Sequence, residues 1–280
     1  MAKRRQSPPP SAPVTSSTPP RLPRKQESLF REVLTLLEKN KVPLAVSGAF
    51  ALRQHTGICR DTKDLDIFLP AEEISRGLEC LMDAGFECEV SDPVWLAKAH
   101  RDGYFVDLIT GMSNAVIVVD ASWIARAEGC EVLGVETRQL APEELIASKL
   151  FVTRRERFDG ADIAHVVYAA QGRLDWGRIS NLVGEHWEIL LWALVLFHYV
   201  YPGCGDYVPA DLWRDLLRRF TDSLAHPGQR DQFRGSLIDP CMFAIDINER
   251  GLEDRLSQYR DRREPLIVLP HKAGGAKAAG

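Results

Sequence analysis

The sequence predicts an α/β (α+β) core with a mixed sheet at residues 27–140 and a mainly helical region at residues 141–270. Up to residue 140, segments with apolar residues at helical spacing alternate with short segments of apolar residues at strand spacing. From Pro142 onward, helical patterns follow one another, and a proline is tolerated in the first turn of a helix. A chain of 280 residues is long enough for one large domain or two modest ones.

The first part begins with a helix, a strand and a glycine turn. A stripe of apolar residues at helical period predicts a helix at 27–40. Residues 42–46 predict a short buried strand, Gly48 predicts a turn, and residues 49–55 predict the beginning of a second helix. The glycine therefore stands between a strand and the N-terminus of a helix.

The remaining elements follow from the same two patterns. Further strands of the core sheet are predicted at 64–69, 86–90, 104–109 and 131–139, with a helix at 71–84. Helices of the second part are predicted at 143–157, 159–171, about 176–200 and 210–225, and a last strand at 266–269. The aromatic-rich stretch at 187–201 is predicted to form the most buried of these helices.

Both ends of the chain lack a hydrophobic pattern. Residues 1–26 are rich in Pro, Ser and Arg and carry six basic residues without an acidic one, and residues 271–280 consist mainly of Gly, Ala and Lys. Such segments bury too little apolar surface to offset the entropy of ordering. Both ends are therefore predicted to be disordered.

The charge distribution argues against a broadly basic surface. The formal net charge is -4, and setting the basic ends aside leaves about -12 for residues 27–270. An acidic body suits metal binding better than nucleic-acid binding, for which only the basic N-terminal arm is a candidate. The sequence thus offers no general indication of a nucleic-acid partner.

Cysteine usage and hydropathy indicate where the protein works. The six cysteines are scattered without a CxxC pair, so reduced thiols are expected. No apolar segment follows the basic start, and no apolar run is long enough to span a bilayer. The sequence predicts a cytoplasmic protein with no membrane partner.

Three aspartates are the candidate metal ligands. Asp64 and Asp66 stand two residues apart on the strand predicted at 64–69, so their carboxylates project from the same side. Asp107, on the strand predicted at 104–109, adds a third carboxylate if the two strands are neighbours. Mg²⁺ prefers oxygen ligands and completes its shell with water and phosphate oxygens, so this set matches a complex of a metal with an NTP. An aspartate pair with this spacing is also common on solvent-exposed strands, which makes its surroundings decisive.

Gly48 marks a candidate phosphate site near the aspartate pair. Backbone N–H groups at a helix N-terminus bind phosphate oxygens, with the help of the helix dipole. This glycine lies about sixteen residues before Asp64, at the beginning of a predicted helix. A phosphate site and a metal site are therefore expected side by side.

The order of these motifs resembles that of a known superfamily. Gly48-Ala49, Asp64-x-Asp66 and Asp107 are similar to the motifs of the minimal nucleotidyltransferases of the DNA polymerase β-like superfamily, particularly the AbiEii-like branch. The resemblance covers roughly residues 43–110. It implies a nucleotidyltransferase fold for the core, with the three aspartates as catalytic metal ligands.

The resemblance extends into the helical region. Lys149 is similar to a lysine of the AbiEii-like branch, and the resemblance implies that it contacts NTP phosphates. Asp159 and Asp162 are similar to a later aspartate pair that helps to shape the site. From the residues alone, both aspartates could equally cap and charge the first turn of the helix predicted at 159–171.

One position departs from the family pattern. Ala49 follows the glycine where many members offer a hydroxyl group to a phosphate. Ser47 is a candidate to replace that hydroxyl. Backbone amides would otherwise bind the phosphates, with three candidate helpers: Arg60, Thr62 and Lys63.

Together these features predict a metal-dependent nucleotidyltransferase that uses ATP or another NTP. It would transfer the NMP group to an acceptor hydroxyl or phosphate and release pyrophosphate, with Mg²⁺ or Mn²⁺ as cofactor. The acceptor could be a small molecule, a tRNA or a protein. The alternative is a catalytically silent nucleotidyltransferase fold that binds nucleotides or a protein partner.

Overall fold

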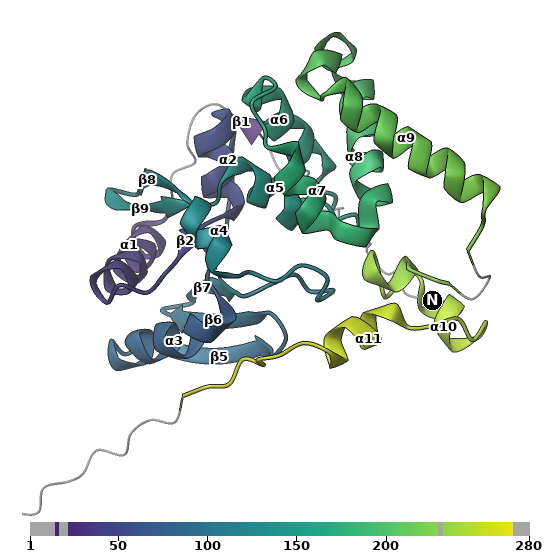
Figure 1. Cartoon of the computed structure of the whole chain (residues 1–280). Coiled ribbons are helices and arrows are strands. Elements are labelled where there is room, and N and C mark those ends of the chain that lie inside the picture. The colour runs from purple at the N-terminus through teal and green to yellow at the C-terminus, as the bar shows by residue number, and fades with distance from the viewer. Residues whose placement is uncertain (1–14, 17–21, 229–231, 271–280) are drawn as a thin grey trace, which may run out of the picture.

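The computed structural model describes residues 15–16, 22–228 and 232–270 (Figure 1). Most of the two predicted disordered ends lies outside these residues. Helix α1 begins at Arg24, inside the stretch predicted to be disordered, because Gln26 is buried there and its side-chain amide donates a hydrogen bond to the carbonyl oxygen of Thr62. In the described part of the chain, no helix is both long enough and apolar enough to cross a membrane.

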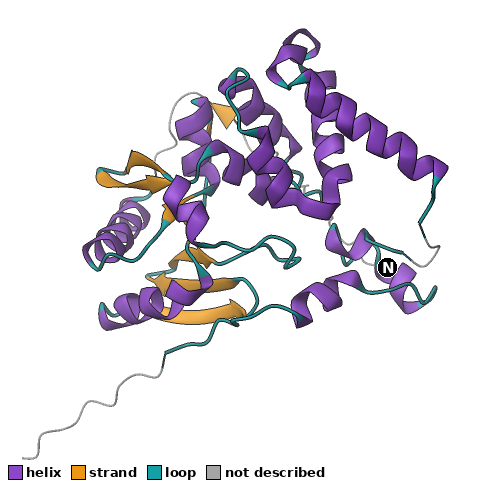
Figure 2. Cartoon of the chain, in the orientation of Figure 1, coloured by secondary structure: helices purple, strands orange, loops and turns teal. Residues whose placement is uncertain are grey.

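A seven-stranded mixed sheet forms the centre of the first part (Figure 2). Its strands lie in the order β5-β6-β7-β4-β2-β9-β8. They span Glu87–Asp92, Leu96–Arg101, Tyr104–Ile109, Asp66–Phe68, Ala45–Val46, Val135–Gln139 and Glu128–Val132, in that order. The pairs β4–β7 and β2–β9 are parallel and the others antiparallel, so the predicted mixed sheet is confirmed. A separate short pair joins β1, Thr15–Ser16, to β3, Cys59–Arg60.

Eleven α-helices surround this sheet or follow it in the described residues. They are α1 Arg24–Lys39, α2 Gly48–Thr56, α3 Ile74–Asp83, α4 Ala121–Arg126, α5 Pro142–Lys149, α6 Gly160–Ala170, α7 Trp176–Val183, α8 Trp187–Val200, α9 Ala210–Ala225, α10 Ala244–Asn248 and α11 Arg255–Asp261. Helices α5 to α9 form the helical region expected after residue 141 (Figure 1).

The sheet separates two apolar clusters. One cluster lies between the sheet and helices α1 and α3, and the other joins the opposite face of the sheet to α2 and to helices of the second part. Strand β4 contributes to both, because Ile67 belongs to the first cluster and Phe68 to the second. Asp66 alternates with Ile67 and therefore projects from the face that looks toward the helical region.

Two predicted helices are shorter than expected. Helix α5 ends at Lys149, and residues 150–159 form a loop rather than the second half of the helix predicted at 143–157. The helix predicted at about 176–200 is interrupted at Gly184, which has a φ of +57° and separates α7 from α8. Such a backbone angle suits glycine and ends a regular helix.

The prediction that α8 is the most buried helix is wrong. Its residues Leu190, Leu194 and Phe197 are buried, but Trp192 is 47% exposed and Tyr199 is 83% exposed. The helix therefore has one buried face, although apolar residues occur on all sides of it.

Two strand predictions differ from the structure, and a strand and a helix were not predicted. Residues 131–139 belong to a hairpin of β8 and β9 rather than to one strand, and Leu133 and Gly134 form its turn with positive φ angles. Strand β6 and helix α4 were not predicted. No strand forms at 266–269 in the described residues, because this segment runs along the sheet region without pairing into a ladder.

The C-terminal segment, residues 232–270, returns from the helical region to the sheet (Figure 1). Ile267 N–H donates to the carbonyl oxygen of Pro93 at 2.7 Å, and Ile267 is buried in the cluster beneath α1 and α3. Arg260 forms an ion pair with Asp92 at 2.9 Å. Arg260 and Ile267 thus attach the C-terminal segment to the first part of the chain.

Candidate active site

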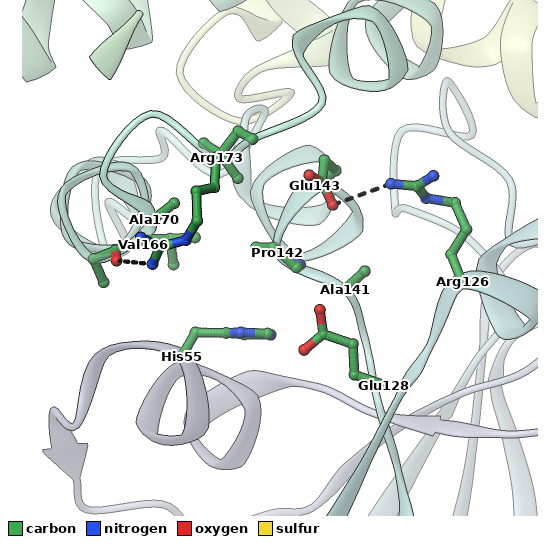
Figure 3. Close-up of a pocket in the computed structure, with 11 residues that line it drawn as sticks. His55, Arg126, Glu128, Ala141, Pro142, Glu143, Val166, Ala170 and Arg173 are labelled. Atoms are coloured by element: carbon green, nitrogen blue, oxygen red, sulfur yellow. Dashed lines mark hydrogen bonds and ion pairs between the residues drawn. The ribbon is translucent and has the colours of Figure 1, made fainter. Parts of the chain in front are cut away.

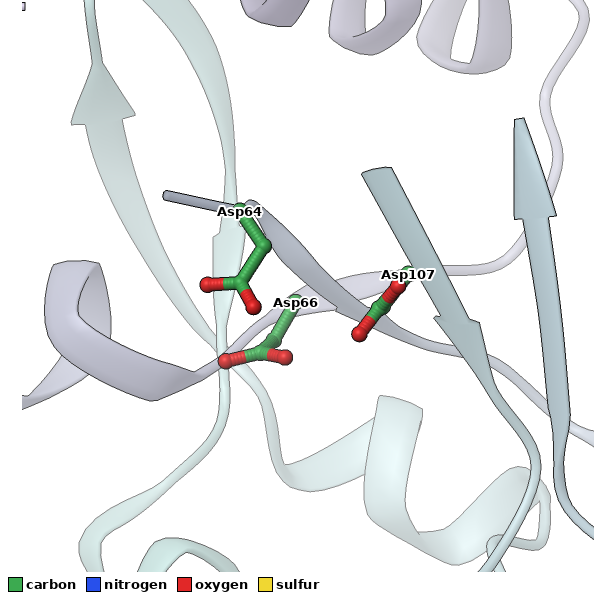
Figure 4. Close-up of side chains that lie close together, drawn as sticks. All are labelled: Asp64, Asp66 and Asp107. Atoms are coloured by element: carbon green, nitrogen blue, oxygen red, sulfur yellow. The ribbon is translucent and has the colours of Figure 1, made fainter. Parts of the chain in front are cut away.

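Asp64, Asp66 and Asp107 lie together where β4 begins (Figure 4). Asp66 is the first residue of β4 and Asp107 lies within β7, whereas Asp64 precedes β4, so the strand predicted at 64–69 begins two residues later than expected. The two strands are parallel, and Asp66 is directly paired with Asp107 in their register. One ligand atom from each carboxylate lies within 4.8 Å of the other two. The structure therefore brings together the three residues predicted to be metal ligands, although only Asp66 and Asp107 lie on strands.

The three residues fit a hard divalent cation. All donors are carboxylate oxygens, which are the ligands that Mg²⁺ prefers. Asp64 and Asp66 are partly exposed and Asp107 is nearly buried, so the cluster is held in the protein on one side and accessible on the other. Three carboxylates from the protein leave room for oxygens of a substrate in octahedral coordination.

Burial and nearby negative charges disfavour the charged forms of Asp66 and Asp107. Burial, together with the negative charges of Asp64 and Asp107, raises the pKa of Asp66 to about 7. Burial also raises the pKa of Asp107, although its hydrogen bond to Lys98 works in the opposite direction. The three carboxylates thus repel one another unless a cation lies near them.

Lys98 is the cation nearest to Asp107 and was not predicted. It lies on β6 directly opposite Asp107 in the antiparallel register with β7. Its ammonium group forms an ion pair with Asp107 Oδ1 and also lies 4.2 Å from the centre of the Phe105 ring. Lys98 therefore neutralises one of the three carboxylates.

Gly48 begins α2 beside Asp66. Its φ is +59°, and a Cβ atom at this position would overlap the Asp66 carboxylate. The backbone N–H of Ser47 donates to the carbonyl oxygen of Asp66 at 2.9 Å, which joins the turn to β4. A residue without a side chain is thus required for the helix N-terminus to approach the acidic cluster so closely.

The segment before β4 orients Asp64. The hydroxyl of Thr62 donates to Asp64 Oδ1 at 3.0 Å and is also 2.8 Å from the carbonyl oxygen of Asp64. Lys63 is exposed and forms no ion pair within the described part of the chain. Thr62 therefore orients Asp64, a predicted metal ligand. The phosphate contacts predicted for Thr62 and Lys63 stay predictions.

Lys149 lies in a buried ion-pair network next to the cluster. Its ammonium group is 2.8 Å from Asp159 Oδ2 and 2.9 Å from Asp162 Oδ2. Asp162 also pairs with Arg60. Burial lowers the pKa of Lys149, while Asp159 raises it. Lys149 thus holds two aspartates at the start of α6, and its contact with NTP phosphates remains a prediction.

Arg157, on the loop between α5 and α6, extends this network toward the acidic cluster. Its guanidinium pairs with Asp159 at 3.0 Å. The hydrogen bond to Asp159 raises the pKa of Arg157, and the negative charges of Asp66 and Asp64 raise it further. Sequence patterns could not identify this residue, because an arginine in a loop carries no periodic signal.

Two cavities lie near α2. One, of about 470 Å³, lies between the C-terminal end of α2, β8, α5 and α6, with His55 and Glu128 facing each other across it (Figure 3). The other, of about 450 Å³, is lined by Ala49, Arg60 and Thr62 among others. In the described residues, the three aspartates line neither of these two cavities.

The mixed sheet, the glycine at the start of α2 and the three neighbouring aspartates are the features that the resemblance to the nucleotidyltransferases predicts. The comparison with protein families agrees. The chain belongs to the family described as "Nucleotidyl transferase of unknown function (DUF2204)", whose sequence model matches residues 26–188. A search of the curated proteins found no match.

Several solved structures are distantly similar to this chain. The antibiotic-resistance factor ANT(2'')-Ia is 16% identical, with a TM-score of 0.41, over 63% of this chain and 98% of that one. The lincosamide antibiotic adenylyltransferase LnuA is 17% identical, with a TM-score of 0.36, over 52% and 96%. An antigenic nucleotidyltransferase-like protein from Paracoccidioides brasiliensis is 16% identical, with a TM-score of 0.42, over 70% and 94%.

Proposed function

We propose that this protein is a metal-dependent nucleotidyltransferase that transfers the NMP group of an NTP to an acceptor hydroxyl or phosphate. The acceptor oxygen attacks the α-phosphorus, the bond between the α-phosphorus and the bridging oxygen breaks, and pyrophosphate leaves. The observation that carries the proposal is the convergence of Asp64, Asp66 and Asp107 beside the N-terminus of α2.

The three aspartates would hold Mg²⁺ or Mn²⁺. A divalent cation bound there lowers the pKa of an acceptor hydroxyl and stabilises the negative charge of the leaving pyrophosphate. Asp107 is the candidate for receiving the acceptor proton. Its Oδ1 atom is paired with Lys98, which leaves Oδ2 for this role.

The residues around the aspartates would bind and orient the nucleotide. The backbone N–H groups of the first turn of α2 are suited to phosphate oxygens, since Gly48 lets this turn approach the cluster. Further candidates for binding the nucleotide are Ser47, Arg60, Thr62, Lys63 and Lys149. Thr62 would act indirectly, by orienting Asp64.

The experiment is a transfer assay with α-labelled NTPs, Mg²⁺ or Mn²⁺, and a panel of acceptors that includes small molecules, tRNA and the protein itself. We expect label transfer that disappears in Asp64→Ala and in Asp107→Ala. Asp83→Ala, which removes an exposed carboxylate at the end of α3, is the control and should keep full activity.

The Lys98–Asp107 ion pair favours one alternative, a catalytically silent fold that binds a nucleotide or a protein. The lysine occupies part of the position that a cation would need. Binding of an NTP without transfer to any acceptor, with either metal, would support this alternative over the enzyme.

A further inference from the structure

The C-terminal segment contacts the loop that borders the candidate active site. This loop, residues 150–159, links α5 to α6 and is exposed at 154–158. Arg157 and Asp159 pair with each other on it, and Asp159 also pairs with Lys149. The position of the loop therefore determines where the Arg157 guanidinium lies relative to the three aspartates.

The loop has little internal structure to hold it. Its own backbone contacts are an isolated bridge between Thr153 and Phe158 and a few turn hydrogen bonds, such as Asp159 N–H to the carbonyl oxygen of Val152 at 2.9 Å. A loop of this kind takes its position from contacts with the rest of the protein.

One buried carboxylate provides such a contact. Asp239, in the C-terminal segment, is 4% exposed, and its Oδ2 atom accepts a hydrogen bond from Arg155 N–H at 3.2 Å. Its Oδ1 atom accepts from the N–H groups of Cys241 and Met242, each at 3.0 Å. One oxygen therefore holds the loop, and the other holds the turn that Asp239 itself begins.

Neighbouring contacts fix the same region from a second side. Arg154 donates to the hydroxyl of Ser113 at 2.6 Å, and the adjacent Asn114 donates to the carbonyl oxygen of Leu237 at 3.0 Å. Asn114 is buried. The segment around Asp239 is thus itself attached to the sheet domain, so it can serve as a fixed support for the loop.

We propose that Asp239 is a positioning residue that holds the loop at 150–159, so that Arg157 is directed toward the triphosphate of a bound nucleotide. The nucleotide part rests on the proposed function, whereas the holding of the loop does not. Asp239 lies outside residues 26–188, which the family model matches, so this support comes from a part of the chain beyond the shared region.

Asp239→Asn is the sharpest variant, because it has nearly the same shape. The amide oxygen can still accept from Cys241 and Met242, but the NH₂ group that replaces Oδ2 cannot accept from Arg155 N–H. Asp254→Asn is the matched control. Asp254 lies in the same segment and caps α11 by accepting from Ser257 N–H, and asparagine caps a helix equally well.

The first measurement is limited trypsin digestion of the full chain, with the fragments identified by mass. Cleavage after Arg154, Arg155 or Arg157 reports on the loop. We expect it to be about tenfold faster in Asp239→Asn, at an unchanged thermal midpoint, and unchanged in Asp254→Asn. The second measurement is binding of a non-hydrolysable ATP analogue with Mg²⁺, which should be about tenfold weaker in Asp239→Asn only.

Loop cleavage at the wild-type rate in Asp239→Asn would overturn the proposal, as would a uniform increase of cleavage along the whole chain. If Asp239→Asn does not fold, Arg155→Pro removes the N–H donor instead and should accelerate cleavage after Arg157. A wild-type protein that binds no nucleotide would contradict the proposed function. The digestion would then still decide whether Asp239 holds the loop.

Discussion

Lys98 and Asp107 face each other on neighbouring antiparallel strands, and their side chains form an ion pair inside the candidate metal site. The ammonium group occupies one oxygen of a carboxylate that a divalent cation would use. The site therefore contains a cation of its own, and a bound metal would compete with it for Asp107.

Removing the ammonium group of Lys98 should strengthen metal binding. We expect Lys98→Met to bind Mn²⁺ about tenfold more tightly than the wild type, because Asp107 loses its ionic partner and the cluster loses a nearby positive charge. Calorimetric titration of the metal-free protein measures the affinity. Lys63→Met removes an exposed positive charge near Asp64 and should change the affinity by less than about threefold. Weaker binding by Lys98→Met would mean that Lys98 orients Asp107 for the metal instead.

A side chain at position 48 should destroy the site. In Gly48→Ala the new methyl group meets the Asp66 carboxylate, so we expect Mn²⁺ affinity and any transferase activity to fall by about a hundredfold or more. Gly57→Ala is the matched control: φ is +72° there too, but the methyl group meets nothing within 4 Å. It should cost about 1 kcal/mol of stability and leave metal binding intact, as denaturation and titration would show.

Metal binding should depend on pH through Asp66. Its pKa is raised to about 7 by burial and by the charges of Asp64 and Asp107, and only the ionised carboxyl group binds a cation. We expect Mn²⁺ affinity to fall as the pH drops below about 7, with proton release on binding. Titrations in buffers of different ionisation enthalpy count the protons. An affinity that stays constant from about pH 6 to pH 8 would contradict this assignment.

The same raised pKa predicts the opposite trend for the stability of the metal-free protein. Because the folded-state pKa of Asp66 is above its ordinary value of 3.8, the folded state binds the proton more tightly than the unfolded chain. This stabilisation is fully present below pH 3.8 and is lost as the pH rises through about 7. Asp66→Asn should therefore melt about 5 °C above the wild type at about pH 8 in the presence of a chelator. Equal melting temperatures there would exclude a raised pKa.

We expect Lys149 to contribute to the stability of the folded protein. Lys149→Met leaves the buried carboxylates of Asp159 and Asp162 with only their arginine partners. We expect the free energy of unfolding to fall by about 2–4 kcal/mol, measured by urea denaturation. Lys63→Met, at an exposed position, should change it by less than about 0.5 kcal/mol. A fully stable Lys149→Met variant with weak NTP binding would instead assign Lys149 to the phosphates alone.

The acidic cluster could be predicted from the sequence because its signals are local. The two-residue spacing predicted that Asp64 and Asp66 lie close together, and they do, although Asp64 precedes β4. A glycine between strand and helix marks the N-terminus of α2. The pairing of Lys98 with Asp107 also has a local signal in the sequence. Asp102 and Gly103 have positive φ angles and form a two-residue hairpin turn, and counting outward from it pairs Lys98 with Asp107.

Other parts of the site had no such signal. Asp239 reaches Arg155 across 84 residues of sequence, and nothing in the local pattern of either residue indicates the contact. The exposure of Tyr199 is likewise decided by what packs against α8, because an apolar sequence alone cannot distinguish a buried helix face from an uncovered one. Long-range packing set both outcomes.

Ile267 places a constraint on biosynthesis. All other buried members of its apolar cluster lie between Leu29 and Val132, so the interior of the first half is completed by a residue near the opposite end of the chain. A ribosome releases that residue only after more than a hundred others have followed Val132. The first half is therefore expected to keep a gap in its interior until residue 267 has been synthesised.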